Sequence, residues 1–276
     1  MRSMTVSAVA MANWVAEPEK SFERMAYWVR KAKAAHSDLV LFPELTVQGY
    51  MTAPIARETA EPVPGPTTQR LASLAAELDL VISAGLVERD GDAHFNAHVL
   101  VGKDGLTGKQ RKVHVPTHER PYWDGGSEIS VFDVGGTKVG ITVCRDSFFA
   151  EMLSTLYHKG AEVILMPFGY PTVPRSRYLQ DTIHGMSIIT HCWAYGLYAV
   201  MCNSAEDRAP NAWQPEGMSF PGWAGVISPW GRVAQFTCDD GNGEAMVTET
   251  LNPAELLDRR GHTNFIAGDL RPELYR

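Results

Sequence analysis

The 276-residue sequence has few cysteines and no excess of basic charge. Its four cysteines are too few and too scattered for a disulfide framework, and none belongs to a C-x-x-C pair of the kind that binds zinc or performs redox chemistry. This cysteine usage is typical of a cytoplasmic protein. The formal net charge of -7 provides no basic stripe to neutralise a phosphate backbone, so we expect no nucleic-acid partner.

Long hydrophobic runs are also missing. No segment reaches the roughly 20 apolar residues that span a bilayer, so we expect no membrane association. The first residues, Arg2 followed by MTVSAVAMANWVA, resemble a secretory signal peptide in outline. However, Asn13 and Trp14 interrupt the apolar run, and a helix is expected almost immediately afterwards. We therefore expect this segment to form the first strand of the core.

The motifs of several enzyme classes are absent. The sequence contains no G-x-S-x-G elbow, which a serine hydrolase of the α/β type requires. Its nine histidines form no H-E-x-x-H motif or comparable ligand spacing, so we expect neither a metal nor an organic cofactor. The segment GKDGLTGKQ, residues 102–110, has the wrong spacing for a phosphate-binding loop and lacks its final Ser or Thr.

In the first half of the chain, the apolar pattern predicts strands mixed with helices. A helix is expected after Pro18, where apolar residues recur at helical spacing, and a short strand is expected at residues 38–45. Residues 56–69 are expected to form a loop and residues 70–80 a helix. Residues 80–112 form three apolar runs separated by Asp-Gly turns, which predicts an antiparallel meander.

The apolar pattern of the second half also predicts strands mixed with helices. We expect two strands in residues 131–144, a helix at 149–160, a strand at 161–170, a helix from about 180 to 195, a strand at 197–205 and a hairpin at 224–236. This alternation predicts an α/β fold with helices outside and packed sheets inside. The length and the even spread of apolar residues predict one domain, residues 1–276.

Three chemically active side chains follow predicted strands or the meander: Glu44, Lys112 and Cys144. Ligands of α/β sheets collect beyond the carboxyl ends of strands, so these residues are expected to meet. A thiol nucleophile, a carboxylate base and an ammonium group suit acyl transfer. We expect Lys112 to favour the thiolate and burial to raise the pKa of Glu44. The backbone N–H of Arg145 is expected to join Lys112 in binding the oxyanion.

Each of these residues also has a structural interpretation. A lone cysteine at the end of a strand is more often a buried hydrophobe than a nucleophile, and Glu44 or Lys112 alone could be a surface charge. Their joint order along the chain favours the catalytic interpretation. Asp146 is expected to fix the turn after Cys144. The remaining thiols are expected in the core; these are Cys192, Cys202 and Cys238.

The segments FPELTVQGY, RKVHVP and VGITVCRD resemble, in order, three motifs of the nitrilase superfamily of carbon-nitrogen hydrolases. The resemblance extends almost end to end, to VMCNSA, SPWG and the terminal RPELY. It implies a four-layer αββα sandwich, a homo-oligomer of two or more chains, and a triad of Glu44, Lys112 and Cys144 that forms a thioester. It also implies a second glutamate near the lysine, for which Glu119 is the candidate.

Other residues are expected to lie against the substrate. Tyr50, Phe168 and Gly169 follow from the resemblance, and Trp123 is the tryptophan best suited to line a pocket. Trp213, Trp223 and Trp230 are expected in the core or at a subunit interface. The substrate-binding candidates are Tyr50, Trp123, Arg145, Phe168 and Gly169.

The departures from the superfamily bear on the substrate. Nitrilases tend to carry Cys-Trp-Glu, so the sequence Cys144-Arg145-Asp146 favours amide over nitrile cleavage. One group of carbamoyl amino-acid hydrolases places arginines a few residues after the cysteine, where this chain has Ser147 and Phe148. Two arginines of the predicted loop PTVPRSRY either replace that clamp or are solvated charges; these are Arg175 and Arg177.

We therefore expect cysteine-dependent hydrolysis of a small linear amide or N-carbamoyl compound. Nitrile hydrolysis is the alternative within enzymes. A catalytically silent superfamily member that serves as a binding or assembly subunit is the alternative outside them.

Overall fold

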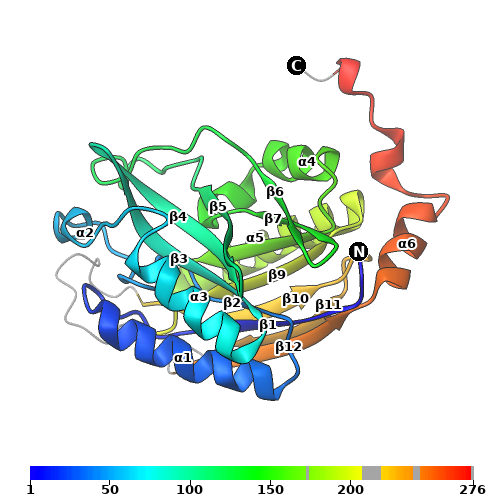
Figure 1. Cartoon of the computed structure of the whole chain (residues 1–276). Helices are drawn as coiled ribbons and strands as arrows, with labels where there is room; N and C mark the ends of the chain where they lie inside the picture. The colour runs from blue at the N-terminus through cyan, green and yellow to red at the C-terminus, as the bar shows by residue number, and fades with distance from the viewer. Residues whose placement is uncertain (172–173, 207–218, 239–242, 275–276) are drawn as a thin grey trace.

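Two six-stranded sheets pack face to face between helices in a computed structural model, which describes residues 1–171, 174–206, 219–238 and 243–274 (Figure 1). The first sheet has the order β12 (Ala245–Leu251), β1 (Met4–Ala10), β2 (Leu39–Leu41), β3 (Val81–Asp90), β4 (Ala93–Gly102), β5 (Gly105–Arg111). The second has the order β11 (Val233–Cys238), β10 (Trp223–Ile227), β9 (Tyr198–Asn203), β8 (Val163–Phe168), β7 (Thr137–Ile141), β6 (Val131–Val134).

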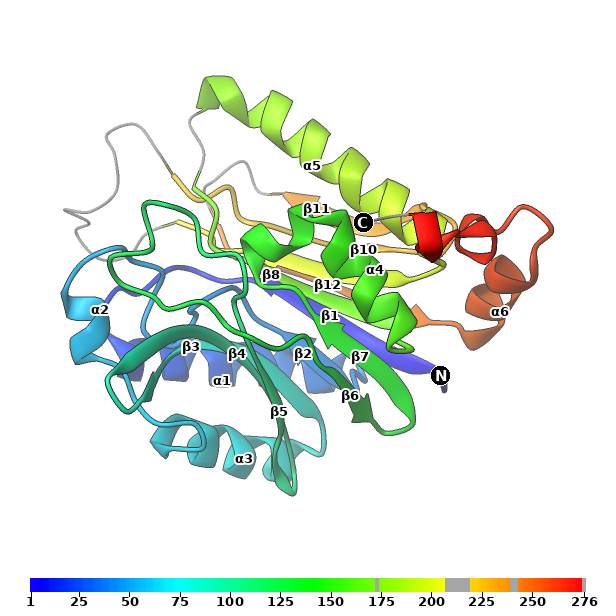
Figure 2. The same cartoon turned by 90° about the horizontal axis from the view of Figure 1, so that it is seen from above.

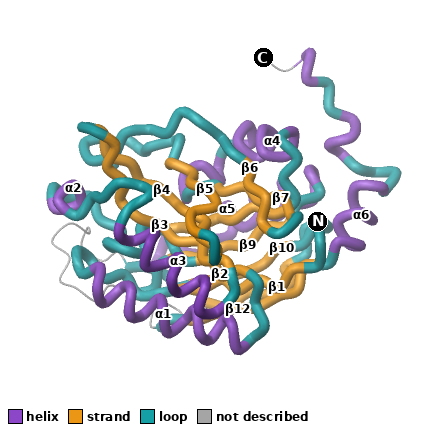
Figure 3. Tube along the Cα trace, in the orientation of Figure 1, coloured by secondary structure: helices purple, strands orange, loops and turns teal. Residues whose placement is uncertain are grey.

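Helices form the outer layers. α1 (Pro18–Ala34) and α3 (Pro66–Leu78) cover the first sheet, and α4 (Ala150–His158) and α5 (Pro174–Tyr195) cover the second (Figure 2). Figure 3 shows the strands inside and the helices outside. The predicted four-layer αββα sandwich is confirmed. The smaller elements are α2 (Ile55–Glu58), α6 (Pro253–Gly261) and the 3-10 turns Cys144–Phe148, Ile266–Asp269 and Pro272–Leu274.

Side-chain alternation along the strands builds the core. On β1, Val6 and Ala8 belong to the apolar cluster between the sheets, whereas Val9 belongs to the cluster beneath α1 and α3. Met25 and Val29 of α1 fill that second cluster, as their helical spacing predicts. Because β1 is buried and pairs with β12 on one side and β2 on the other, the interpretation of the first apolar run as a core strand is confirmed.

Several predicted boundaries are wrong. The strand expected at residues 38–45 ends at Leu41, because Pro43 has no N–H for the ladder and Leu45 has a left-handed φ of 50°. The loop expected at residues 56–69 contains most of α2 and the first turn of α3, which begins at Pro66. Helix α5 begins at Pro174, not near residue 180, and strand β12 and helix α6 were not predicted.

In the described part of the chain, no helix is both long and apolar enough to cross a membrane.

A glycine on β3 allows the turn after β2 to lie against the sheet. A Cβ atom at Gly85 would lie 2.2 Å from the amide nitrogen of Leu45 and 2.9 Å from the carbonyl carbon of Glu44. Because these neighbours are backbone atoms, a side chain here must displace the turn that carries Glu44.

We expect Gly85→Ala to lower the free energy of unfolding by about 1–3 kcal/mol, since overpacking displaces backbone. Gly261→Ala is the control, because a Cβ there meets nothing within 4 Å. It should change the free energy by less than about 1 kcal/mol. Urea unfolding measures both, and equal stability of the two variants would contradict the close approach at Gly85.

Candidate active site

Glu44 lies in the turn that follows β2 and is fully buried. Three groups hold its carboxylate. The side-chain amide of Asn96 donates to Oε1 at 2.7 Å, the ammonium of Lys112 donates to the same oxygen at 2.8 Å, and the backbone N–H of Gly169 donates to Oε2 at 2.7 Å. The donors come from β4, from the end of β5 and from the end of β8, so both sheets fix this one side chain.

Lys112 follows β5 directly, and its ammonium lies between two carboxylates. Besides Glu44, it donates to both oxygens of Glu119, at 2.9 Å and 2.8 Å. The hydroxyl of Tyr50 donates to Glu119 Oε1 at 2.7 Å. All four side chains are buried. The sequence therefore predicts correctly that Glu119 lies beside the lysine.

Cys144 begins the 3-10 turn after β7 and is 6% exposed. Its φ of 48° lies in the left-handed region, which costs a non-glycine residue of order 1–3 kcal/mol. The carboxylate of Glu44 lies close enough to raise the pKa of the thiol. The thiol, the carboxylate and the ammonium, which are far apart in the sequence, thus meet at one end of the two sheets.

Asp146 connects the turn of Cys144 to the loop after Lys112. Its Oδ2 accepts the backbone N–H groups of Val143 and Val113 at 3.3 Å and 3.2 Å. Its Oδ1 accepts the backbone N–H of His114 at 2.8 Å and contacts Nδ1 of the same ring at 2.8 Å. Asp146 therefore fixes the turn, as expected, and also joins it to the segment that carries the lysine.

Burial determines the proton positions in this cluster. It raises the pKa of the Cys144 thiol well above the usual value, and the charge of Glu44 raises it further. It also raises the pKa of Glu44, which the charge of Lys112 only partly offsets. Burial alone lowers the pKa of Lys112, but the carboxylates of Glu44 and Glu119 outweigh it, and the net shift is upward.

Lys112 lowers the pKa of the Cys144 thiol, as expected, but burial and the charge of Glu44 outweigh it, so the net shift is upward. The ammonium is shared by two carboxylates, and its effect on the thiol is smaller than that of burial or of Glu44. The expected rise in the pKa of Glu44 is confirmed in direction.

The substrate-binding candidates lie at different places. Tyr50 and Trp123 are buried in one small apolar cluster beside the charged residues. The N–H of Gly169 is bonded to Glu44. Phe168 ends β8 and lines an apolar cavity of about 70 Å³ with Met201, Trp223 and others. Arg145 is exposed.

Other expectations concern residues beyond the site. Arg175 and Arg177 belong to helix α5, not to a loop, and their side chains lie outside the described part of the structure. Trp213 and the side chain of Cys238 also lie outside it. Cys192 and Cys202 are buried, as expected.

Sequence analysis missed Asn96, although an asparagine inside a predicted strand was a usable signal, because asparagine is depleted from strands. His98, two residues further along β4, has no such role. Burial lowers its pKa to about 3, and Nε2 lies 2.9 Å from the hydroxyl of Ser83. Over the ranges that the structure describes, no group of three or more His, Cys, Asp or Glu side chains could hold a metal ion.

Comparison with known proteins agrees with the fold and the motifs. The sequence model of a family described as carbon-nitrogen hydrolase matches residues 5–256. A Pyrococcus abyssi protein named nitrilase is 37% identical over 188 residues, covering 65% of this chain and 72% of its own. N-carbamoylputrescine amidase of Solanum lycopersicum is 27% identical, covering 100% of this chain and 94% of its own. The crystal structure of a Helicobacter pylori carbon-nitrogen hydrolase superposes with a TM-score of 0.90 at 20% identity, covering 99% of this chain and 97% of that one.

Asn96→Leu tests the support of Glu44. In the wild-type protein, the hydrogen bond from Asn96 lowers the pKa of Glu44. Its loss in the variant must therefore raise that pKa. Glu44 must be ionised to accept the proton of the thiol. The acid limb of the pH profile of kcat/KM for an amide should therefore move to higher pH, and kcat should fall about 10- to 100-fold.

His98→Leu is the matched control, because it removes another buried polar side chain from β4 without touching Glu44. It should leave the acid limb in place. An unshifted limb in Asn96→Leu would show that the amide does not tune Glu44.

Proposed function

The chain belongs to the carbon-nitrogen hydrolase family, and we propose that it hydrolyses a small linear amide or N-carbamoyl compound through a thioester on Cys144. The observation that carries this proposal is the buried cluster in which Lys112 bonds to both Glu44 and Glu119, while the nearby Glu44 raises the pKa of the Cys144 thiol. This set contains a nucleophile, a base and a cation.

In the first step, Glu44 takes the proton of the thiol as Sγ attacks the carbonyl carbon of the substrate. The raised pKa values of both groups suit this transfer, because a neutral thiol then meets a carboxylate that binds a proton more readily than an ordinary one. The carbonyl π electrons move onto oxygen. Lys112 and the backbone N–H of Arg145 are the candidate donors to that oxyanion, and losing one such donor typically costs about 3–4 kcal/mol.

In the second step, the tetrahedral adduct collapses and the C–N bond breaks. Glu44 returns its proton to the leaving nitrogen, so that ammonia or an amine departs and the acyl group stays on sulfur. Water then attacks the thioester, with Glu44 again accepting a proton. The acid leaves, and the thiol recovers its proton.

Glu119 acts in this proposal as a positioning residue for Lys112. It accepts two hydrogen bonds from the ammonium and one from Tyr50, which orients the lysine toward Glu44. Its charge also helps to keep Lys112 protonated, since it raises the pKa of the ammonium. Removing either partner of a buried ion pair typically costs about 3–5 kcal/mol, so Glu119 also supports the stability of the site.

The residues after Cys144 favour amides over nitriles. Arg145 and Asp146 replace the Trp-Glu pair that nitrilases tend to carry. The carboxylate of Asp146 accepts hydrogen bonds from backbone N–H groups. The chemistry implies a small-molecule substrate. Assembly as a homo-oligomer stays a prediction, which sedimentation velocity can measure; the exposed apolar side chains of Val233, Phe236 and Leu257 are candidate contacts.

A substrate panel tests the proposal. The protein is incubated with short aliphatic amides, N-carbamoyl amines and the corresponding nitriles, and released ammonia is measured. We expect turnover of an amide or carbamoyl compound, and an increase in the mass of Cys144 equal to the acyl group in rapidly quenched samples.

Cys144→Ala should lose both the turnover and the adduct, with a drop of at least about 10³-fold in rate. Turnover of nitriles alone would establish the alternative activity. No turnover of any compound, together with an unmodified Cys144, would favour a catalytically silent protein.

A further inference from the structure

The chain segments at the ends of β1 and β9 are hydrogen-bonded to each other. The backbone N–H of Ala205 donates to the carbonyl oxygen of Met11 at 2.8 Å, and the N–H of Asn13 donates to the carbonyl oxygen of Glu206 at 2.9 Å. β1 belongs to the first sheet and is parallel to β2, whereas β9 belongs to the second sheet and is parallel to β8. These bonds therefore join the two sheets at the end where the segments after β2 and β8 form the proposed site.

Each of these two chain segments carries a buried asparagine that holds the backbone of a tyrosine. The side-chain amide of Asn13 accepts the backbone N–H of Tyr50 at 2.7 Å and donates to the carbonyl oxygen of the same residue at 3.2 Å. The amide of Asn203 bonds Tyr170 in the same way, at 2.9 Å and 3.1 Å. An asparagine amide can bond to both backbone groups of one residue because it contains an acceptor and donors, as a peptide group does. The segments that follow β2 and β8 are thereby fixed.

Asn203 lies beside the backbone donor of Glu44. The N–H of Gly169 donates to Glu44 Oε2 at 2.7 Å. The carbonyl oxygen of the same peptide group, that of Phe168, accepts the N–H of Ser204 at 3.1 Å. The next peptide group along the chain is the one whose N–H bonds Asn203. Both peptide groups that flank Gly169 are thus held by the end of β9, which fixes the direction of its N–H.

Asn13 supports the other carboxylate of the site through Tyr50. The hydroxyl of Tyr50 donates to Glu119 Oε1 at 2.7 Å, and both oxygens of Glu119 bond Lys112. The tyrosine ring also lies against Gly169, where a Cβ atom would be 2.7 Å from Cδ2 of the ring. The two segments that the asparagines hold therefore meet at the site, and each supplies one donor to a carboxylate.

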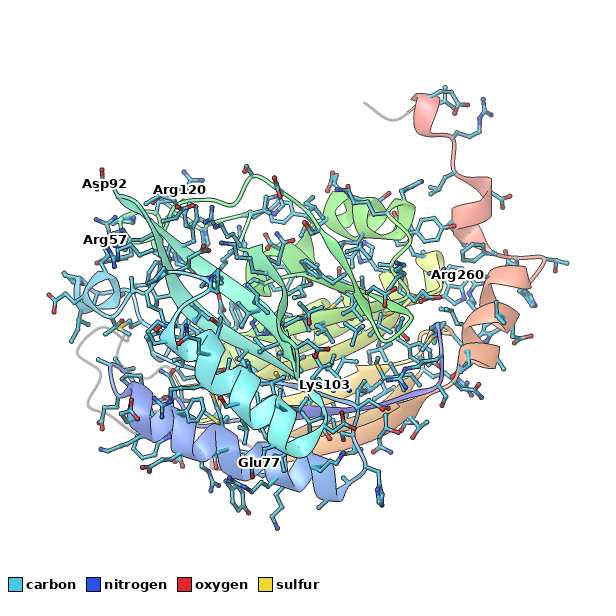
Figure 4. All side chains as sticks on the ribbon, in the orientation of Figure 1. Arg57, Glu77, Asp92, Lys103, Arg120 and Arg260 are labelled. Carbon is cyan, nitrogen blue, oxygen red and sulfur yellow. The ribbon has the colours of Figure 1, made fainter. Side chains whose placement is uncertain are left out.

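The loop that carries Glu119 has a separate support at the surface. Figure 4 shows Arg57 and Arg120 at the same end of the molecule. The guanidinium of Arg57 donates to the carbonyl oxygen of Pro121 at 2.8 Å. Because this bond fixes the backbone close to Glu119, the hydroxyl of Tyr50 serves to orient the carboxylate and not to hold the loop.

We propose that Asn203 and Asn13 are positioning residues of the active site. Asn203 fixes the backbone donor to Glu44. Asn13 fixes the hydroxyl donor to Glu119. The inference rests on the proposed hydrolase function and adds two residues to it. Since the asparagines lie in the hydrogen-bonded ends of β1 and β9, the joint between the two sheets sets the geometry of both carboxylates.

Asn203→Leu tests the first residue, because it removes both hydrogen bonds to Tyr170 with a side chain of similar size. The N–H of Gly169 should then bond Glu44 less well, and a carboxylate that loses a donor has a higher pKa. We expect the acid limb of the pH profile of kcat/KM for an amide to move to higher pH. We also expect kcat to fall about tenfold, with KM changed by less than about threefold. If Asn203→Leu does not fold, Asn203→Ser should show the same shift.

A double-mutant cycle tests the second residue. Asn13→Leu should lower kcat about tenfold, because the hydroxyl of Tyr50 is no longer held on Glu119. Tyr50→Phe already removes that hydroxyl. The double variant should therefore be slower than Tyr50→Phe by less than about threefold. Losses that multiply in the double variant would overturn the assignment of Asn13.

Tyr198→Phe is the matched control for loss of buried hydrogen bonds. Its hydroxyl, at the opposite end of β9 from Asn203, bonds Glu255 and the backbone of Asn252. The variant should leave the acid limb in place and change kcat by less than about twofold. An unshifted acid limb in Asn203→Leu, or an equal shift in Tyr198→Phe, would overturn the assignment of Asn203.

Failure of the hydrolase function itself is distinguishable. If no amide is hydrolysed, exchange of backbone hydrogens with deuterium is measured by mass spectrometry. Exchange in residues 168–171 that is faster in Asn203→Leu than in both the wild type and Tyr198→Phe supports the hold on this segment alone. Equal exchange in the three proteins rejects it.

Discussion

The site depends on a single buried ammonium that is held between two carboxylates. Lys112 bonds Glu44 at 2.8 Å and both oxygens of Glu119, and all three side chains are out of contact with water. Burying these charges is costly, and the cost is offset only if each remaining oxygen has a donor. Asn96, Gly169 and Tyr50 supply those donors. The ends of β2, β5 and β8, which are followed by Glu44, Lys112 and Gly169, must therefore lie close together. The packing of the two sheets fixes this arrangement.

This arrangement determines the resting state of the nucleophile. With two carboxylates to one ammonium, the cluster adds a negative field to the effect of burial, and the pKa of Cys144 rises. A preformed thiolate, as in a cysteine next to an imidazolium, is not what this environment favours. Nucleophilicity must instead come from Glu44 during the attack. The same carboxylate is then protonated and ready to serve the leaving nitrogen, which makes one group both base and acid.

Sequence reasoning predicted the parts that local pattern determines. The motifs around Glu44, Lys112 and Cys144 identified the cluster, and the alternation of strands and helices gave the layers. It could not predict that Asn96 reaches Glu44, because that contact is set by the placement of β4 beside the turn after β2. Nor could it predict the direction of the pKa of Cys144, since that depends on how two carboxylates share the lysine. The early start of α5 and the existence of β12 likewise depend on tertiary packing more than on periodicity.

The most direct test of the central claim is the protonation state of Cys144 in the resting protein. Thiolate absorbance in the ultraviolet, recorded between pH 5 and 10 as the difference between the wild type and Cys144→Ala, measures it. The account predicts no thiolate signal at pH 7, with absorbance appearing only at a higher pH than a free cysteine needs to ionise. A thiolate signal already present at neutral pH would contradict the account, because it would mean that the charge of Lys112 outweighs burial and Glu44 in setting the pKa of the Cys144 thiol.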